Sequence, residues 1–250
     1  MLEEVKQPDN NILELPSEPA AAGSQYDAAA KNRFEFEIEQ GGEKYDIAQV
    51  FKPLTDERYM KWLRDLNVSS KGDEVSENSR QATADLWDEL IAGIENVDYP
   101  EGADFRDLIE SSDKVRALNE FLAVAVVEPE SDGTKKLRLG EKATEQTVRT
   151  ECWFDGEVLT QTHVLAAKTF ELEKEYDRIQ QKTSRTERTR GLRGKPKVEY
   201  VPQDDRLGQL YDKMLVRSDG FAAGIVPLRF KTLVIGYVFA PSLRAKTVGK

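Results

Sequence analysis

The sequence has a single histidine, His163, and a single cysteine, Cys152, among its 250 residues. One cysteine excludes an internal disulfide, and one cysteine with one histidine cannot supply the roughly four ligands of a structural zinc site. Catalytic arrangements that need a second histidine are excluded as well. A lone cysteine also fits a protein that works in a reducing compartment.

Motifs that bind phosphate or calcium are also lacking. The chain contains no Gly-x-Gly-x-x-Gly, no Walker-type Gly-Lys-Ser/Thr and no calcium loop with its glycine and terminal glutamate. The run 191–195 resembles a phosphate loop only superficially, because it follows a polar stretch and Pro196 comes next. We therefore predict no cofactor, no metal site and no enzymatic activity.

Long hydrophobic runs are absent. The longest one, 232–240, is far shorter than the roughly 20 residues that a membrane helix needs. The first residues, MLEEVKQPDN, lack the cationic and apolar regions of a signal peptide. These features predict a soluble protein with no membrane partner, present in the cytoplasm during synthesis.

Charge is abundant and mostly negative. The sequence has 46 Asp and Glu residues against 36 Lys and Arg residues, which gives a net charge of −10. Charged residues make up 33% of the chain, more than the roughly one quarter that is usual in globular proteins. This balance argues against general coating of DNA, which depends on cationic side chains. The exception is the basic run 182–197, which has no aromatic residue for base stacking.

One pattern occurs twice, at 34–66 and at 150–179. Each copy has two runs of alternating apolar and polar residues, which predict a β-hairpin, followed by an amphipathic helix with a threonine cap. The hairpin turns and the caps have the same spacing in the two copies: Gly42 and Thr55 in the first, Gly156 and Thr169 in the second.

Two later blocks repeat in the same order. Residues 86–91 match 210–215 in residue class, and 118–129 match 230–241. Apolar spacing predicts helices at 84–97 and 113–127, with an exposed loop at 67–81 between the first helix and the second. The predicted fold class is α+β: two tandem copies of a β-hairpin followed by about three helices, with a flexible N-terminal arm.

The expected organisation has five parts. A disordered or docking arm is followed by the first repeat, a charged linker, the second repeat with a long basic loop at 182–203, and a short tail. Their bounds are 1–32, 33–129, 130–147, 148–241 and 242–250.

Three groups of residues are candidates for partner binding. The arm could insert apolar side chains into a neighbour, and the basic loop could contact an acidic protein surface, contact a phosphate backbone, or remain inert. Alternation places Trp153 on the strand face opposite Cys152, at a surface between repeats or between molecules. Cys152 itself is predicted to be a buried structural residue at the position of Phe36 in the first copy. The candidates are Ile12, Leu13, Leu15, Trp153, Arg188, Arg190 and Arg193.

The segment 118–129, LNEFLAVAVVEP, resembles the apolar helix ending in Val-Glu-Pro of some phage tail-assembly chaperones. The hairpins, capped helices, acidic arm and charged loop together resemble small structural and assembly proteins of tailed bacteriophages. The resemblance implies a non-enzymatic virion or tail component that acts through protein–protein surfaces, with other structural proteins or further copies of itself as partners. The alternatives are a soluble tail-assembly chaperone and a nucleic-acid-associated protein that uses 182–197.

Overall fold

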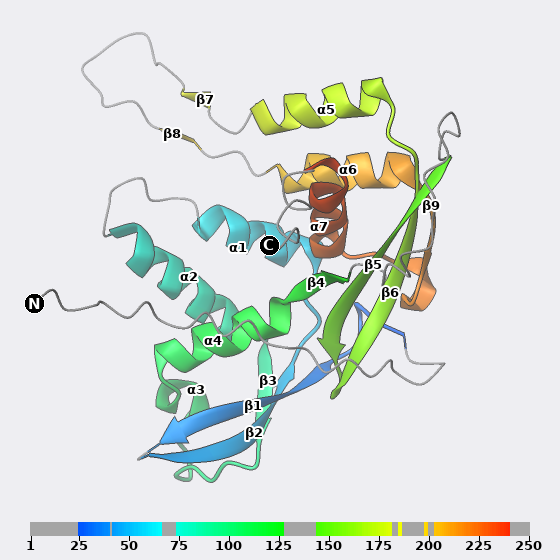
Figure 1. Ribbon diagram of the computed structural model, residues 1–250. Helices are drawn as coiled ribbons and strands as arrows, with labels where there is room; N and C mark the ends of the chain where they lie inside the picture. The colour runs from blue at the N-terminus through cyan, green and yellow to red at the C-terminus, as the bar shows by residue number, and fades with distance from the viewer. Residues whose placement is uncertain are drawn as a thin grey trace, which may run out of the picture.

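The computed structural model is an α+β protein with two main antiparallel sheets and helices packed against both (Figure 1). This architecture confirms the predicted fold class. The structure describes residues 25–40, 42–66, 74–127, 144–181, 185–186, 198–199 and 203–240.

The first sheet belongs to the N-terminal repeat and has the order β1-β2-β3. Its strands are β1 (Asn32–Gln40), β2 (Glu43–Phe51) and β3 (Ile91–Glu95). Along β1, Phe34 and Phe36 are buried while the intervening glutamates are exposed, as the alternation predicted.

Helices of the N-terminal repeat cover this sheet, and the last of them leads into a strand of the other sheet. The first helix begins where predicted, since the Thr55 hydroxyl oxygen accepts a hydrogen bond from the Arg58 backbone N–H at 3.3 Å. The elements are α1 (Asp56–Leu66), α2 (Glu74–Leu90), α3 (Phe105–Leu108), α4 (Ser111–Leu122) and β4 (Val124–Val127).

The second sheet has the order β4-β5-β6-β9, so its first strand comes from the N-terminal repeat. Thr169 again caps the helix after the hairpin, through a 3.3 Å hydrogen bond from the Leu172 N–H. The elements are β5 (Glu145–Phe154), β6 (Glu157–Ala166), α5 (Phe170–Gln181), β7 (Arg185–Thr186), β8 (Val198–Glu199), α6 (Asp204–Met214), β9 (Leu215–Asp219), the 3-10 turn η1 (Ala222–Gly224) and α7 (Leu228–Phe239).

The two repeats share details of backbone geometry as well as the order of their elements. In each, a helix runs directly into a strand that pairs with the second strand of the hairpin. In each pairing the register shifts at the same place, and a residue with positive φ follows the strand. The shifts lie between Val50 and Phe51 and between Val164 and Leu165, and the positive-φ residues are Asn96 and Gly220.

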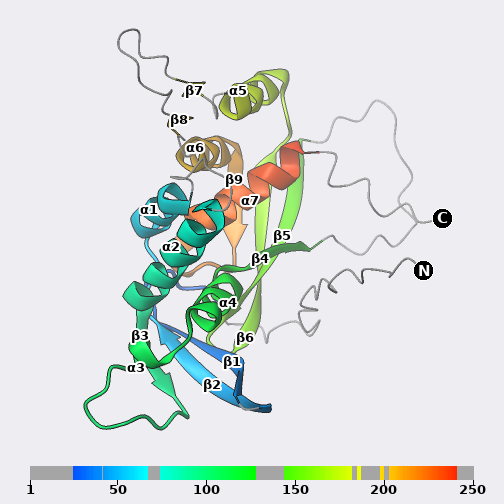
Figure 2. The ribbon, with the colours of Figure 1, turned by 90° about the vertical axis from the view of Figure 1, so that its left-hand side faces the viewer.

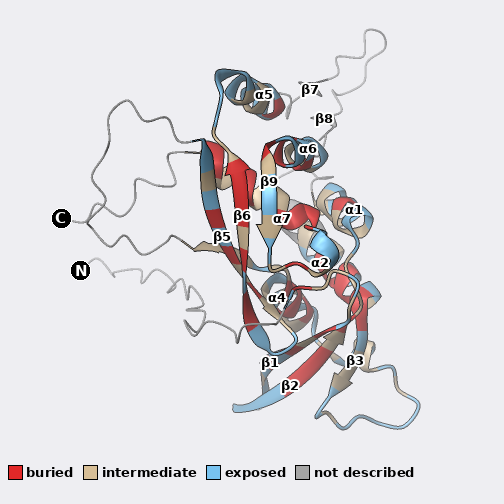
Figure 3. Cartoon of the chain, turned by 90° about the vertical axis from the view of Figure 1, so that its right-hand side faces the viewer, coloured by how far each residue is buried: buried red, intermediate tan, exposed pale blue. Residues whose placement is uncertain are grey.

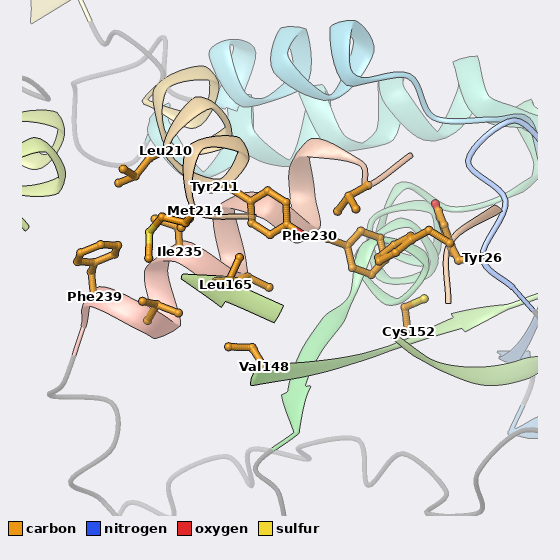
Figure 4. Close-up of a cluster of buried hydrophobic side chains, with 14 of the residues drawn as sticks. Tyr26, Val148, Cys152, Leu165, Leu210, Tyr211, Met214, Phe230, Ile235 and Phe239 are labelled. Atoms are coloured by element: carbon orange, nitrogen blue, oxygen red, sulfur yellow. The ribbon is translucent and has the colours of Figure 1, made fainter. Parts of the chain in front are cut away.

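Each repeat has a hydrophobic core of its own (Figure 3). The N-terminal core is built around Trp87 and Phe51, which are both fully buried. The C-terminal core is built around Tyr211 and Phe230, and Figure 4 shows their side chains with those of neighbouring strands and helices. Burial of this apolar surface stabilises each unit at roughly 25 cal/mol per Å².

Three predicted boundaries in the N-terminal repeat are wrong. The expected helix 84–97 ends at Leu90 and continues as β3, and the expected helix 113–127 ends at Leu122 and continues as β4. Part of the expected loop 67–81 belongs to α2, which begins at Glu74. Short apolar runs suit a strand or a helix equally well, and pairing with β2 and β5 decides the outcome here.

The predicted match of 118–129 with 230–241 is also out of register. Ser111–Leu122 and Leu228–Phe239 are the equivalent helices, and each is 12 residues long. The same ion pair follows from this alignment, because Lys114 Nζ lies 2.8 Å from Asp88 and Lys231 Nζ lies 2.8 Å from Asp212. The connection between β9 and α7 is shorter than the equivalent connection between β3 and α4. Similarity of apolar runs alone therefore pairs α4 with the wrong part of α7.

The predicted arm 1–32 is wrong at its C-terminal end. Tyr26 is 6% exposed and packs in the core of the C-terminal repeat, beside Phe230 (Figure 4). Its backbone N–H donates to Gly220 O and its carbonyl accepts from Ala222 N, both at 2.9 Å. Asn32 already belongs to β1, and β5 begins at Glu145, inside the predicted linker. Residues 1–24 and the tail 242–250 lie outside the described residues.

Candidate protein interaction surface

A chain of buried polar side chains crosses the sheet of the C-terminal repeat at β5 and β6. His163 on β6 is fully buried. Its Nδ1 lies 2.7 Å from the Tyr211 hydroxyl, and its Nε2 lies 3.0 Å from Thr150 Oγ1. Thr150 Oγ1 lies 3.1 Å from Gln161 Oε1, and the Gln161 amide nitrogen donates to Leu159 O at 3.0 Å.

One direction of proton donation satisfies this chain. Tyr211 donates to Nδ1 of His163, the opposite ring nitrogen donates to Thr150, and the Thr150 hydroxyl donates to the Gln161 carbonyl oxygen. The histidine is then neutral, with its proton on Nε2. A buried polar network that is satisfied in this way holds its members in one arrangement.

Burial also determines the charge states at this site. It lowers the pKa of His163 to about 4, and it raises the pKa of the Cys152 thiol to about 11. At neutral pH the site therefore holds a neutral imidazole and a protonated thiol, which is 1% exposed. A thiol of this kind is a poor nucleophile. The predicted burial of Cys152 is confirmed, but its equivalent in the first repeat is Ile38 rather than Phe36, because the hairpins align at Gln40 and Phe154.

The N-terminal repeat has an equivalent hydrogen bond between its second strand and its helix, made by different side chains. Gln49 occupies the position of His163 and is also fully buried, and its Oε1 accepts a 2.8 Å hydrogen bond from Trp87 Nε1. Trp87 on α2 is equivalent to Tyr211 on α6. Each repeat thus uses one buried polar group on its second strand to fix the aromatic residue of its helix. This recurrence assigns the His163 network a structural role.

The two repeats contact each other along a region that we call the seam, and its first contact is the pairing of β4 with β5. β4, which follows α4, lies antiparallel to β5 and pairs Val124 with Cys152 and Val127 with Arg149. Figures 1 and 2 show this strand leaving the helices of the N-terminal repeat and joining the second sheet. Main-chain hydrogen bonds therefore join the repeats directly.

A second contact of the seam lies at the tip of the second hairpin. The Asn32 side chain accepts a 2.6 Å hydrogen bond from Asp155 N and donates a 3.4 Å one to Trp153 O. The Trp153 ring packs edge-on against Phe34, with ring centroids 6.2 Å apart, and contacts the N-terminal core. Trp153 therefore bridges the repeats through its backbone and its side chain.

A third contact is centred on Arg229, at the start of α7. This guanidinium is buried, donates to the Tyr26 hydroxyl at 2.8 Å and to Phe121 O at 3.2 Å, and lies against both aromatic rings. Beside it, the Leu228 N–H donates to an Asp56 carboxylate oxygen at 2.9 Å. One cationic side chain thus ties the N-terminal segment, α4 and α7 together.

Of the predicted partner-binding residues, the structure describes one. Trp153 lies in the seam between the repeats, whereas the other six fall outside the described residues: Ile12, Leu13, Leu15, Arg188, Arg190 and Arg193. Sequence reasoning missed Asn32, Arg229 and the whole of β4. The run Val124–Val127 carried a usable signal, because β-branched residues favour strands.

Within the described ranges, no group of three or more His, Cys, Asp or Glu side chains is placed to hold a metal ion. No helix in this part of the chain is long and apolar enough to cross a membrane. Comparisons of the chain with protein-family models, curated proteins and solved structures found no match.

Proposed function

We propose that this chain is a structural or assembly protein that acts through protein–protein surfaces. The observation that supports this role best is the pairing of β4 with β5, in which one unit contributes a strand to the sheet of the next unit. Strand addition of this kind is a general mode of protein recognition, since the main chain supplies affinity and alternate side chains supply specificity.

Further edges of the sheets are available for such contacts. Among the strands that the structure describes, β1 and β3 form the two edges of the first sheet, and β9 forms one edge of the second. An unpaired edge is a template for another strand. The buried anchors at Gln49 and His163 hold these sheets rigidly against their helices, so the edges keep a defined shape.

The narrower form of the proposal is a component of a bacteriophage particle or tail. Its support is the resemblance of 118–129 to a helix of some tail-assembly chaperones. The structure departs from that resemblance at Val124–Val127, which form the strand β4 instead of a helix. The basic run 182–197, on which a nucleic-acid role would depend, lies outside the described residues apart from β7.

Sedimentation of the natively expressed protein, with quantitative mass spectrometry of each fraction, tests the proposal. We expect the chain to travel at fixed stoichiometry with a large assembly. Recovery only in light fractions, bound to one other chain, would favour an assembly chaperone. Recovery only as a free monomer at native concentration would contradict an assembly role.

A further inference from the structure

The outer edge of β1 is the counterpart of the edge to which β4 binds. The hairpin registers align Glu35–Ile38 of β1 with Arg149–Cys152 of β5, the residues that pair with β4. In the described part of the chain, no strand lies beyond this edge of β1. The N-terminal repeat thus presents, at β1, a strand site whose equivalent in the C-terminal repeat, at β5, is filled by β4.

The main-chain groups of this edge are set by the hairpin register. Since Gln40 and Glu43 flank the turn and form a hydrogen-bonded pair, the N–H and C=O groups of Glu35 and Glu37 point away from β2. One of these groups has a side-chain partner, because Arg116 donates to Glu37 O. Arg116 also lies over the Phe36 ring, 4.5 Å from its centroid, and so covers part of the edge.

The segment equivalent to β4 follows α7. Since α4 and α7 are equivalent along all 12 residues, Ala123 matches Ala240, and Val124–Val127 match residues 241–244. Both alanines follow the last residue of their helix, and the backbone N–H of each donates to a carbonyl of the last turn, Glu120 O for Ala123 and Gly236 O for Ala240. The sequence of this segment and the residues beyond it reads PSLRAKTVGK.

The residue types of this segment suit the β1 edge. In the register of β4 on β5, Ser242 would lie opposite Glu37, Leu243 opposite the buried Phe36, and Arg244 opposite the exposed Glu35. Apolar would meet apolar and basic would meet acidic across the strands. Pro241 would fall at a position whose N–H points away from β1, where a proline is tolerated in an edge strand.

The contacts between the two repeats indicate whether the segment after α7 binds β1 of its own molecule or β1 of a second copy. Two units related by a two-fold axis make every contact twice, in both directions. Here Asn32 bonds to the tip of the other hairpin, whereas its equivalent Gln146 bonds to Ala166 in its own hairpin. Asp56 accepts from α7, whereas its equivalent Phe170 is 64% exposed and has no carboxylate.

The contact between the repeats is therefore head to tail. A head-to-tail relation continues from unit to unit, and it gives rings or open filaments instead of a closed pair. The next unit after the C-terminal repeat is the N-terminal repeat of a second copy.

We propose that residues 241–244 of one molecule add as a strand to the outer edge of β1, at Glu35–Ile38, in a second copy of this chain. This inference rests on the proposed assembly role and names its partner. Arg116 would move from Glu37 O as the incoming Ser242 N–H takes its place. The equivalent of Arg116 on α7 is the apolar Leu233, which leaves no such donor beside β5.

Cysteine crosslinking of the full chain tests the pairing directly. Glu35→Cys and Arg244→Cys place two thiols opposite each other, while Cys152, at 1% exposure, does not compete. We expect the oxidised mixture of the two single variants to give a disulfide-linked dimer, and the double variant to give a ladder. Glu39→Cys, which is exposed on the same face but farther along β1, should give about tenfold less product with Arg244→Cys.

Crosslinking within single molecules of the double variant would overturn the assignment to a second copy. Absence of any crosslink would overturn the pairing itself. If either result accompanies fixed stoichiometry in a large particle, the assembly role survives and only this inference fails.

Sedimentation velocity of untagged full-length variants supplies an independent measure. Ser242→Pro removes the N–H that faces Glu37 and should weaken self-association about tenfold. Ala245→Pro removes an N–H that faces away from β1 and serves as the matched control, with unchanged association. Arg116→Leu, which installs the apolar residue type of the other repeat, should strengthen association. Equal behaviour of the two proline variants would contradict the proposed register.

Discussion

Protonation of His163 should cost this protein stability in mild acid. Its pKa is about 6.5 in an unfolded chain and about 4 in the folded protein, because burial disfavours the imidazolium. Between these values the unfolded state binds a proton that the folded state does not bind. The free energy of unfolding therefore falls as the pH drops below 6.5, and the loss levels off near pH 4.

The size of the effect follows from the two pKa values. A difference of roughly 2.5 units at about 1.4 kcal/mol each amounts to roughly 3 kcal/mol. Carboxyl groups titrate in the same range, so the contribution of His163 has to be isolated by comparison. His163→Gln is the matched variant, because Gln49 fills the equivalent position of the first repeat and accepts a hydrogen bond from an aromatic donor.

Urea denaturation of both proteins from pH 7.5 to pH 4 measures the difference. At pH 7.5 we expect the wild-type protein to be more stable by about 1 kcal/mol, since glutamine reproduces the network imperfectly. At pH 4 the order should reverse, with the variant more stable by roughly 2 kcal/mol. The reciprocal variant, Gln49→His, should introduce a loss of the same sign into the N-terminal repeat. Parallel stability curves across this range would refute the assignment of a neutral, buried imidazole.

Three further predictions concern the backbone, the seam and the thiol. Gly220→Ala should destabilise the protein by roughly 2 kcal/mol in urea denaturation, because φ is +88° and the added Cβ would lie 2.9 Å from Thr160 O. Gly156→Ala, at φ +83° with open space around it, should cost about 1 kcal/mol, and equal costs would contradict the contact. Trp153→Ala should lower the free energy of unfolding by roughly 2 kcal/mol, and unchanged stability would remove this residue from the seam. Cys152 should react with a thiol reagent at pH 8 about 100-fold more slowly in the folded protein than in urea, and equal rates would refute its burial.

The hairpins and helix starts could be predicted from the sequence because their causes are local. Alternation along β1 and β5 identifies a more buried and a more exposed face, and Asp155-Gly156 is a strong turn signal that the structure shows at positive φ. The threonine caps need only the N–H groups of the following turn. The duplication followed from these local features, since they recur with the same spacing.

Local patterns could not predict whether the short apolar runs form a helix or a strand. Ile91–Glu95 and Val124–Val127 continue helical patterns and yet are strands, because each meets the edge of a hairpin that needs a partner. In runs of four or five residues, the intrinsic preference for helix or strand is weak, so pairing with a neighbouring strand decides the secondary structure.

By itself, the sequence determined the class of fold, the repeated unit and the scarcity of residues for thiol, imidazole or zinc chemistry. Only the tertiary structure decided where the repeats meet and what holds them together. Gln49 and His163 find their aromatic partners 38 and 48 residues away, and β4 finds its partner in the other repeat. Such contacts depend on the positions of whole elements in space, which no local pattern of residues records.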